Sequence, residues 1–208
     1  MAVSKTVPPE RLRAAIAAGL ATLGENRVQE LTAKAAVLPG VTWHLVGHLQ
    51  GNKARAALEV AAVIHSVDSL DLARRLDRLL EAPTVEAVAP ALRVPRPIYL
   101  EVNVDADPAK AGFAPATLAA GLGELAALPH LRLAGLMTVG RLVAGPDEAR
   151  PTFAALRRLS AELRAGEPRL GAGLSMGMSD DFEVAVEEGA TIVRIGRAIF
   201  GERPPAAA

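Results

Sequence analysis

The sequence predicts a single (β/α)8 barrel, an α/β TIM barrel in which eight parallel strands are each followed by a helix. Short apolar segments alternate along the chain with longer segments of helical pattern, as in parallel sheets with crossover helices. Eight such short segments occur within 208 residues, a length that suits one large domain. Half of the residues are hydrophobic, which is enough for a sizeable core.

The expected strands are short, and the clearest is Ile98–Val104, which reads Ile-Tyr-Leu-Glu-Val-Asn-Val. Alternating or continuous apolar residues bounded by polar or glycine residues mark each one. In chain order they are Ala2–Ser4, Ala21–Gly24, Trp43–Val46, Val63–Ser66, Ile98–Val104, Leu133–Met137, Gly173–Met176 and Ile192–Ile195.

The expected helices follow the strands and carry apolar residues at helical spacing. They are Arg11–Leu20 after Pro8-Pro9-Glu10, a helix through Val28, Leu31 and Ala35, then Gly51–Ala62, Leu70–Leu80, Pro115–Leu128, Pro146–Leu163, Ser179–Glu188 and a stub from Ala198. Ala82–Pro97 holds four prolines and is expected to be a long loop. Residues 1–203 should form the barrel, and residues 204–208 a frayed tail.

Composition excludes several classes of function. Lys plus Arg and Asp plus Glu both number 23, and aromatic residues make up 3%, so neither a basic surface nor base-stacking platforms indicate nucleic-acid binding. The absence of cysteine excludes disulfides, zinc–thiolate sites and a cysteine nucleophile. No run of 18 apolar residues and no signal-peptide pattern occurs, so a cytoplasmic protein without a membrane partner is expected.

A barrel of this kind carries its active site at the carboxyl ends of the strands. Polar side chains, glycines and one methionine gather at or just after those ends, from at least seven strands. They are Lys5, Glu25, Asn26, Arg27, Gly47, His48, Gln50, Asn52, Asp68, Asn103, Thr138, Met178, Ser179, Arg194 and Gly196.

Lys5 follows the first strand, in Ala2-Val3-Ser4-Lys5-Thr6. A lysine that loses solvent among barrel loops has a lowered pKa, and its free amine can form an imine with a carbonyl compound. The alternative is a lysine whose ammonium group extends into solvent at the barrel rim.

His44 and His48 lie four residues apart around the third strand, within Trp43–Lys53. That spacing brings two imidazoles together on a helix but not on a strand, and no HExxH motif is present. The sequence therefore favours hydrogen bonds that line a polar pocket over a metal site.

Two glycine-flanked strand exits indicate an anion site. Ser179 is expected to cap the helix that follows the seventh strand. The free backbone N–H groups in the first turn of that helix suit an anion. After the last strand, Gly196 allows close approach of the backbone to an anion, and in phosphate-binding barrels these two loops commonly hold the phosphate. The alternative is a salt-bridged Arg194 at an ordinary strand end.

Several motifs occur together and in order. They are Ala2–Thr6, Gly24–Glu30, Trp43-His44 with Gly47–Gln50, Ser66–Ser69, Gly135–Thr138, Ser175–Phe182 and Val193–Gly196. Together these closely resemble the pyridoxal phosphate homeostasis protein family, of the YggS/PROSC type, over essentially the whole chain.

The resemblance implies the fold of the N-terminal barrel of alanine racemase and pyridoxal 5′-phosphate (PLP) as the cofactor. It implies a Schiff base on Lys5, and a phosphate cradle at Ser179 and the backbone of Gly196 and Arg197. It also implies that Arg194 faces the pyridine nitrogen, which disfavours protonation of that nitrogen and weakens the ring as an electron sink. Asn26 and His48 fall in pocket motifs and are given only a lining role.

Three departures from the family pattern stand out. The family normally has a helix before the first strand, so this start, which can be internal to a longer protein, is expected to leave one barrel wall exposed. Arg197 stands where the family usually has a small hydroxyl residue. Its backbone would still contact the phosphate, but the contact from a hydroxyl group would be lost. Gly51 replaces a common serine, with no clear consequence.

The leading hypothesis is therefore a monomeric protein of PLP homeostasis without an established turnover, with PLP-dependent apoenzymes as possible recipients. A second is an amino-acid racemase, which needs bases on both faces of the substrate, whereas the single tyrosine, Tyr99, is expected at the wrong end of the barrel. A third is a barrel that binds a phosphate ligand without PLP, which leaves Lys5 without a role.

Overall fold

The computed structural model describes residues 1–81, 95–141 and 145–201. Within these ranges seven strands pair in chain order, from β1 to β7, and each neighbouring pair is parallel. The strands are β1 (Ala2–Val3), β2 (Thr22–Glu25), β3 (Thr42–Leu45), β4 (Val63–Val67), β5 (Arg96–Glu101), β6 (Leu131–Met137) and β7 (Gly173–Ser175). A parallel sheet in strict chain order is the arrangement of a β/α barrel.

The expected eighth strand, Ile192–Ile195, closes the ring through single parallel bridges. Ile192 bridges Ser175 of β7, and Ile195 bridges Ala2 of β1. The backbone nitrogen of Val3 lies 2.8 Å from the oxygen of Ile195. Because β1 has two residues and β7 has three, the segment finds few partners on either side. The predicted barrel class is confirmed, although its last strand is paired by bridges rather than by a regular ladder.

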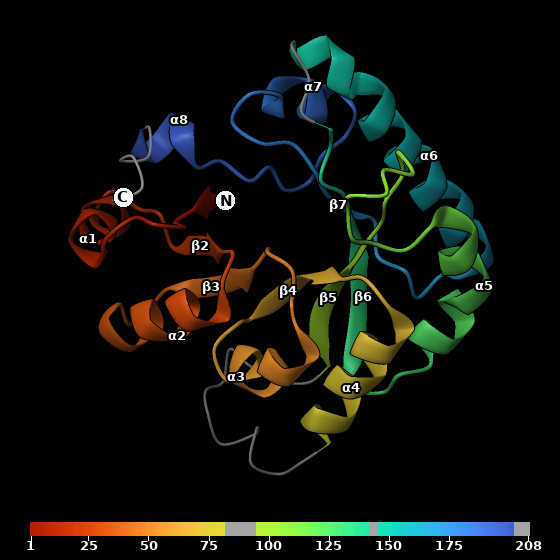
Figure 1. Ribbon diagram of the computed structural model, residues 1–208, viewed down its shortest axis with the longest axis horizontal. Coiled ribbons are helices and arrows are strands. Elements are labelled where there is room, and N and C mark those ends of the chain that lie inside the picture. The colour runs from red at the N-terminus through yellow and green to blue at the C-terminus, as the bar shows by residue number, and fades with distance from the viewer. Residues whose placement is uncertain (82–94, 142–144, 202–208) are drawn as a thin grey trace.

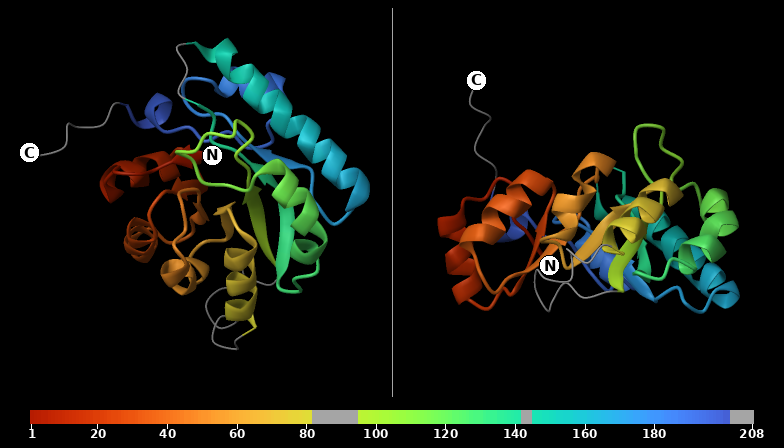
Figure 2. Two further views of the ribbon diagram at one scale, coloured as in Figure 1. Left: turned by 45° about the vertical axis from the view of Figure 1, so that its right-hand side comes forward. Right: turned by 90° about the horizontal axis from the view of Figure 1, so that it is seen from below.

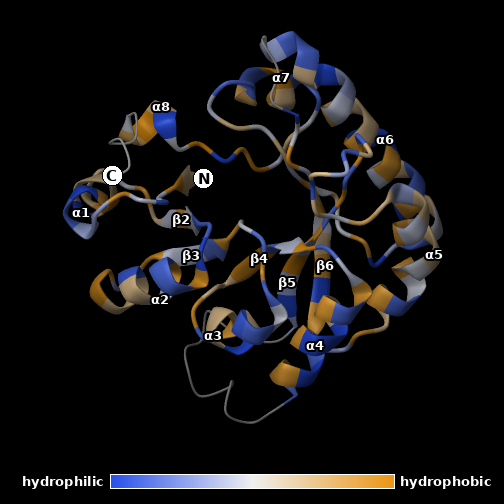
Figure 3. Ribbon diagram, viewed as in Figure 1, coloured by the Kyte–Doolittle hydropathy of each residue, from blue (hydrophilic) through white to orange (hydrophobic). Residues whose placement is uncertain are grey.

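The helices lie around the outside of the strands (Figures 1 and 2). They are α1 (Pro9–Ala17), α2 (Val28–Val37), α3 (Ala54–Leu58), α4 (Leu70–Leu80), α5 (Pro115–Ala126), α6 (Arg150–Gly166), α7 (Phe182–Glu187) and α8 (Arg197–Phe200), with 3-10 turns at η1 (Gly51–Lys53) and η3 (Pro146–Ala149). Figure 3 shows hydrophilic and hydrophobic residues on the same helices, as expected where one face packs on the sheet.

One predicted helix differs from the observed element, and two other predicted segments lie wholly or largely outside the described residues. The helix expected over Gly51–Ala62 is a 3-10 turn followed by a short helix that ends at Leu58. Of the expected loop Ala82–Pro97, residues 82–94 lie outside the described ranges, and the chain enters β5 at Arg96. The expected tail, 204–208, also lies outside them.

The predicted helix cap at Ser179 is wrong. The helix α7 begins at Phe182, and Asp181 occupies the position before it. The Asp181 carboxylate accepts a hydrogen bond from the backbone nitrogen of Met178 at 2.5 Å, while the Ser179 hydroxyl bonds to the chain after Ile195. The chain turns just before Ser179, where Gly177 has a φ of +91°, and the helix begins only after Asp181.

The expected exposure of the first strand is also wrong for the residues of β1. Ala2 and Val3 are buried, with 1% and 6% of their surface exposed. They are covered because β1 lies between β2 and the Ile192–Ile195 segment. Among the described helices, none is long and apolar enough to cross a membrane.

Candidate functional site

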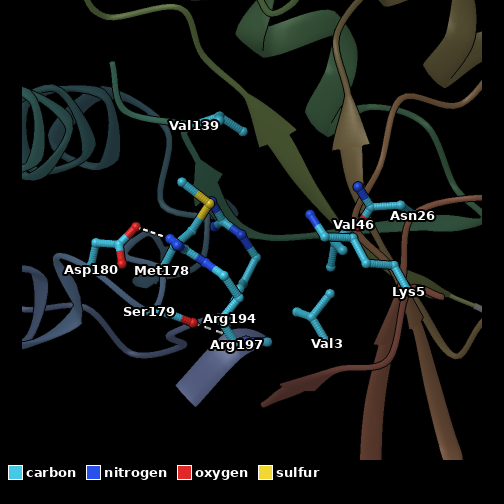
Figure 4. Close-up of a pocket in the computed structure, with 11 residues that line it drawn as sticks. Val3, Lys5, Asn26, Val46, Val139, Met178, Ser179, Asp180, Arg194 and Arg197 are labelled. Atoms are coloured by element: carbon cyan, nitrogen blue, oxygen red, sulfur yellow. Dashed lines mark hydrogen bonds and ion pairs between the residues drawn. The ribbon is translucent and has the colours of Figure 1, made fainter. Parts of the chain in front are cut away.

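A cavity of about 550 Å³ opens at the carboxyl ends of the strands (Figure 4). Six of the seven residues that the sequence singles out line it, and His48 does not. The full lining is Val3, Lys5, Asn26, Val46, Val139, Met178, Ser179, Asp180, Arg194, Gly196 and Arg197. The volume lies in the range of cavities that hold small organic ligands.

Lys5 occupies a tight turn directly after β1, and its side chain extends into the cavity (Figure 4). The nitrogen of Val7 donates to the oxygen of Ser4 at 2.9 Å and closes the turn. Thr6 has a φ of 64°, a conformation that a β-branched residue adopts only under constraint. Its nitrogen donates to the Glu30 carboxylate at 3.0 Å. The backbone on both sides of Lys5 is therefore fixed.

A buried ion pair between Lys34 of α2 and Glu25 of β2 supports this turn. The Lys34 ammonium also donates to the backbone oxygen of Ser4 at 2.7 Å and to Glu30 at 3.2 Å. The Ser4 hydroxyl donates to Glu25 at 2.9 Å. Because each buried charge has several partners, the cost of taking these charges out of water is offset.

Asn26 is placed in the cavity by the backbone around it. Its nitrogen donates to the Glu25 carboxylate at 3.1 Å, so the same buried cluster fixes its position. A Cβ atom on Gly47 would lie 2.2 Å from the oxygen of Asn26, so only glycine allows the two segments to approach this closely. Asn26 is not a helix cap, because Arg27 precedes α2 and makes no side-chain cap.

The opposite wall of the cavity carries the Ser179 hydroxyl and the backbone that follows Ile195. The Ser179 hydroxyl oxygen lies 3.2 Å from the nitrogen of Gly196 and 3.4 Å from that of Ala198, and accepts from both. Its own proton remains to be donated to an acceptor. A Cβ on Gly196 would meet Val3 at 3.5 Å, an ordinary contact, so the protein alone does not require glycine there. Arg197 forms an exposed ion pair with Asp180.

Arg194 is buried and its guanidinium group reaches the cavity wall. One terminal nitrogen donates to the oxygen of Ser175 at 2.7 Å and to its hydroxyl at 3.0 Å, and the other donates to the oxygen of Thr138 at 2.8 Å. Burial lowers the pKa of Arg194 to about 10, while Glu101 and Asp181 act in the opposite direction. The group is therefore a fixed positive charge near neutral pH. Among the described residues, the salt-bridged strand end considered from the sequence is not observed, because these three bonds go to neutral oxygens.

His48 and His44 point to different places. His48 pairs with Asp68, with 3.1 Å between Nδ1 and Oδ2, and lines a separate cavity of about 480 Å³. His44 lies in the barrel interior, with its Nδ1 2.9 Å from Nε2 of His65. The described residues contain no cluster of three or more potential metal ligands.

Sequence reasoning missed residues that act from behind the cavity wall. Lys34 bonds to the residue before Lys5, Ser175 bonds directly to Arg194, and His65 bonds to Ser175. All three are buried. A signal for Lys34 was available, because it lies three residues after Leu31 on the apolar face of the helix. Ser175 and His65 gave no such signal, since their partners are distant in sequence.

Comparison with known proteins identifies the family of this chain. The family model "Alanine racemase, N-terminal domain" matches residues 1–204. The chain belongs to this family. It is 40% identical over 205 residues to the pyridoxal phosphate homeostasis protein of Aquifex aeolicus, and 42% identical to that of Pseudomonas aeruginosa. The alignments cover 98% of this chain and 86% and 84% of those proteins.

Solved structures give the same result. PipY of Synechococcus elongatus, with PLP bound, is 44% identical and superimposes with a TM-score of 0.86 over 97% of this chain and 91% of PipY. An alanine racemase of Clostridium difficile is 14% identical and has a TM-score of 0.78, covering 99% of this chain and 52% of that one. The racemase likeness concerns the fold alone.

Proposed function

We propose that this chain binds PLP in the cavity and takes part in PLP homeostasis. One observation carries the proposal: the side chain of Lys5 extends into the same cavity that Ser179 and Arg194 line from the other side. PLP has an aldehyde, a phosphate and a pyridine nitrogen. An amine, a set of hydroxyl and backbone donors and a fixed cation therefore suit its three reactive parts.

Lys5 is the residue proposed to carry PLP as a Schiff base, since its amine can condense with the aldehyde and release one water. Lys34 cannot take this part, because its ammonium group is held by Glu25, Glu30 and the oxygen of Ser4. When bound, PLP supplies an electrophilic imine and a conjugated ring. The protein supplies the fixed turn that presents Lys5.

The phosphate is proposed to lie against the Ser179 hydroxyl and the backbone at Gly196 and Arg197. Arg194 is proposed to face the pyridine nitrogen, where a fixed positive charge disfavours protonation of that nitrogen. Asn26 lines the cavity beside Lys5. His48 is proposed as a pocket residue only at the neighbouring cavity, where it pairs with Asp68.

Retention of PLP, rather than turnover, fits the lining of the cavity. Among the described lining residues the acid–base groups besides Lys5 are Asp180, Arg194 and Arg197, and Asp180 is paired with Arg197. Racemisation needs a second base facing Lys5 across the ring. Tyr99 does not serve, because it is buried in β5 and stacks on His65. The proposal includes a cytoplasmic monomer with PLP-dependent apoenzymes as recipients.

Absorbance of the purified protein with added PLP tests the proposal. The wild type should be yellow, and borohydride should fix the cofactor to the peptide that contains Lys5. Lys5→Ala should fold but remain colourless. Lys53→Ala, at a lysine outside the cavity lining, is the matched control and should stay yellow. A yellow Lys5→Ala would reject the assignment, and binding of phosphate esters without an imine band would favour a barrel without PLP. Rapid racemisation of alanine would contradict the retention role.

A further inference from the structure

A chain of buried polar groups runs from Arg194 into the interior of the barrel. The Ser175 hydroxyl lies 3.0 Å from a terminal nitrogen of Arg194 and 2.9 Å from Nδ1 of His65. The Nε2 of His65 lies 2.9 Å from Nδ1 of His44. Ser175 comes from β7, His65 from β4 and His44 from β3. Of these four residues, only Arg194 lines the cavity.

The direction of these hydrogen bonds follows from the chemistry of Arg194. A guanidinium group only donates, so the Ser175 oxygen must accept from it. Among the described residues, the other partner of that hydroxyl is Nδ1 of His65. If the hydroxyl oxygen accepted from His65 as well, its proton would have no acceptor among the described residues, which is costly for a buried group. The hydroxyl proton is therefore assigned to Nδ1 of His65, whose own proton then lies on Nε2 and is donated to His44. His44 then also carries its proton on Nε2. A guanidinium at one end thus sets the tautomer of two histidines.

The surroundings keep both histidines neutral. Burial lowers the pKa of His65 well below its ordinary value, and the charges on His44, Arg194 and the amino terminus act in the same direction. Burial and the amino-terminal charge lower the pKa of His44 to about 4. The ring of Tyr99 stacks on His65 with 4.5 Å between centroids, which holds the imidazole plane.

These hydrogen bonds orient the guanidinium group of Arg194 and leave some of its N–H donors unused. Its three bonds to Ser175 and Thr138 occupy three of the five N–H donors of a guanidinium. Among the described residues, no bond to the remaining two is found, so they are available to a ligand in the cavity. Burial of several polar groups is a poor way to gain stability, so the arrangement is better understood as a device that orients Arg194.

We propose that Ser175, His65 and His44 are positioning residues, which hold the Arg194 guanidinium at the aromatic nitrogen of bound PLP and thereby set its protonation. This inference rests on the proposed PLP site. None of the three contacts the ligand. They act by restricting the guanidinium to one orientation, as hydrogen-bonded partners behind a ligand residue do in other sites.

Spectroscopy of the PLP-loaded protein tests the proposal. Ser175→Ala removes the link to His65 but keeps the backbone oxygen that Arg194 also uses. It should shift the absorbance maximum of bound PLP and weaken PLP binding about tenfold, as for one lost bond to a charged group. His65→Leu should do the same, whereas His65→Gln, which can accept from Ser175 and donate to His44, should restore the wild-type spectrum.

Tyr99→Phe is the matched control, because it keeps the ring that packs on His65 and is outside the hydrogen-bonded chain. Its spectrum should be that of the wild type. If it shifts as much as Ser175→Ala, general core packing explains the effect and the proposal fails. An unshifted spectrum and unchanged affinity in Ser175→Ala would also overturn it. In both cases a colourless Lys5→Ala would still support the PLP site, so the two failures are distinguishable.

A second measurement needs neither a variant nor PLP. Nitrogen-15 NMR of histidine-labelled wild-type protein reports the tautomer of each ring directly. His44 and His65 should both be neutral and protonated on Nε2 at pH 7. Protonation of His65 on Nδ1 would reverse the direction of the chain and reject the proposal, whether or not a substituted protein folds.

Discussion

The ammonium nitrogen of Lys34 lies 2.7 Å from the backbone oxygen of Ser4, the residue directly before Lys5. The same ammonium forms a buried ion pair with Glu25, which accepts from the hydroxyl of Ser4. One lysine therefore fixes the turn from which another lysine reaches the cavity. The two lysines have different roles. Lys34 makes structural contacts, whereas Lys5 extends into the cavity.

Replacement of Lys34 should destabilise the fold and loosen Lys5. In Lys34→Met the Glu25 carboxylate stays buried without its partner, so the free energy of unfolding should fall by about 3–5 kcal/mol. Urea unfolding followed by circular dichroism measures this. The double variant Lys34→Met/Glu25→Gln removes the unpaired charge and should recover much of the loss. Equal stability of the single variant and the wild type would show that the pair does not support the turn.

The strained conformation of Thr6 offers a second test of the same turn. At a φ of 64° a threonine is disfavoured, whereas asparagine tolerates this region. Thr6→Asn should therefore raise the free energy of unfolding by about 1 kcal/mol. Thr6→Val keeps the branched side chain but loses the hydroxyl that donates to the oxygen of Lys5 at 2.6 Å, and should be less stable than the wild type. The opposite order would mean that the conformation stores no strain.

The fold was predictable because each buried strand leaves an apolar run and each helix an apolar face. The convergence of Lys5, Ser179 and Arg194 also followed, since the carboxyl ends of barrel strands meet at one face. Local motifs were less reliable. The sequence around Ser179 suits a helix cap, yet its hydroxyl bonds to Gly196 from a distant segment.

The outward turn of His48 could not be predicted for a related reason. His48 pairs with Asp68, which follows a different strand, and the neighbouring Gly47 approaches Asn26 closely. Both contacts depend on the packing of neighbouring strands. Ser175 and His65 are 110 residues apart in the chain, so no local pattern joins them. Contacts between segments that are distant in the sequence cannot be predicted from local sequence patterns.

Glu101 should give the protein a pH-dependent stability. Burial raises its pKa to about 7, the nearby charge of Asp68 acts in the same direction, and Arg194 and His48 act against them. Because the folded pKa exceeds the unfolded value, the folded state binds the extra proton. The stabilisation is present below pH 4.5 and is lost as the pH rises through about 7.

Glu101→Gln mimics the protonated carboxyl and should remove this dependence. Above pH 7 it should be more stable than the wild type by about 1–3 kcal/mol, and near pH 4.5 the two should be equal. Urea unfolding at pH 5 and pH 8 measures the difference. Glu59→Gln, at an exposed residue, controls for the substitution itself. A Glu101→Gln variant that is less stable at pH 8 would show that the carboxylate is stabilised in its charged form.

Gly47 should be far less tolerant of a side chain than Gly51, although only three residues lie between them. A Cβ at Gly47 would be 2.2 Å from the backbone oxygen of Asn26, and neither backbone can move without displacing a strand end. Gly47→Ala should lower the free energy of unfolding by about 1–3 kcal/mol and weaken PLP binding by shifting Asn26 in the cavity wall. At Gly51 a Cβ meets only the flexible side chain of Arg75 at 3.4 Å, so Gly51→Ala should be nearly neutral in both measurements. If Gly47→Ala and Gly51→Ala have the same stability and the same affinity for PLP, the close approach of Gly47 does not determine the position of Asn26.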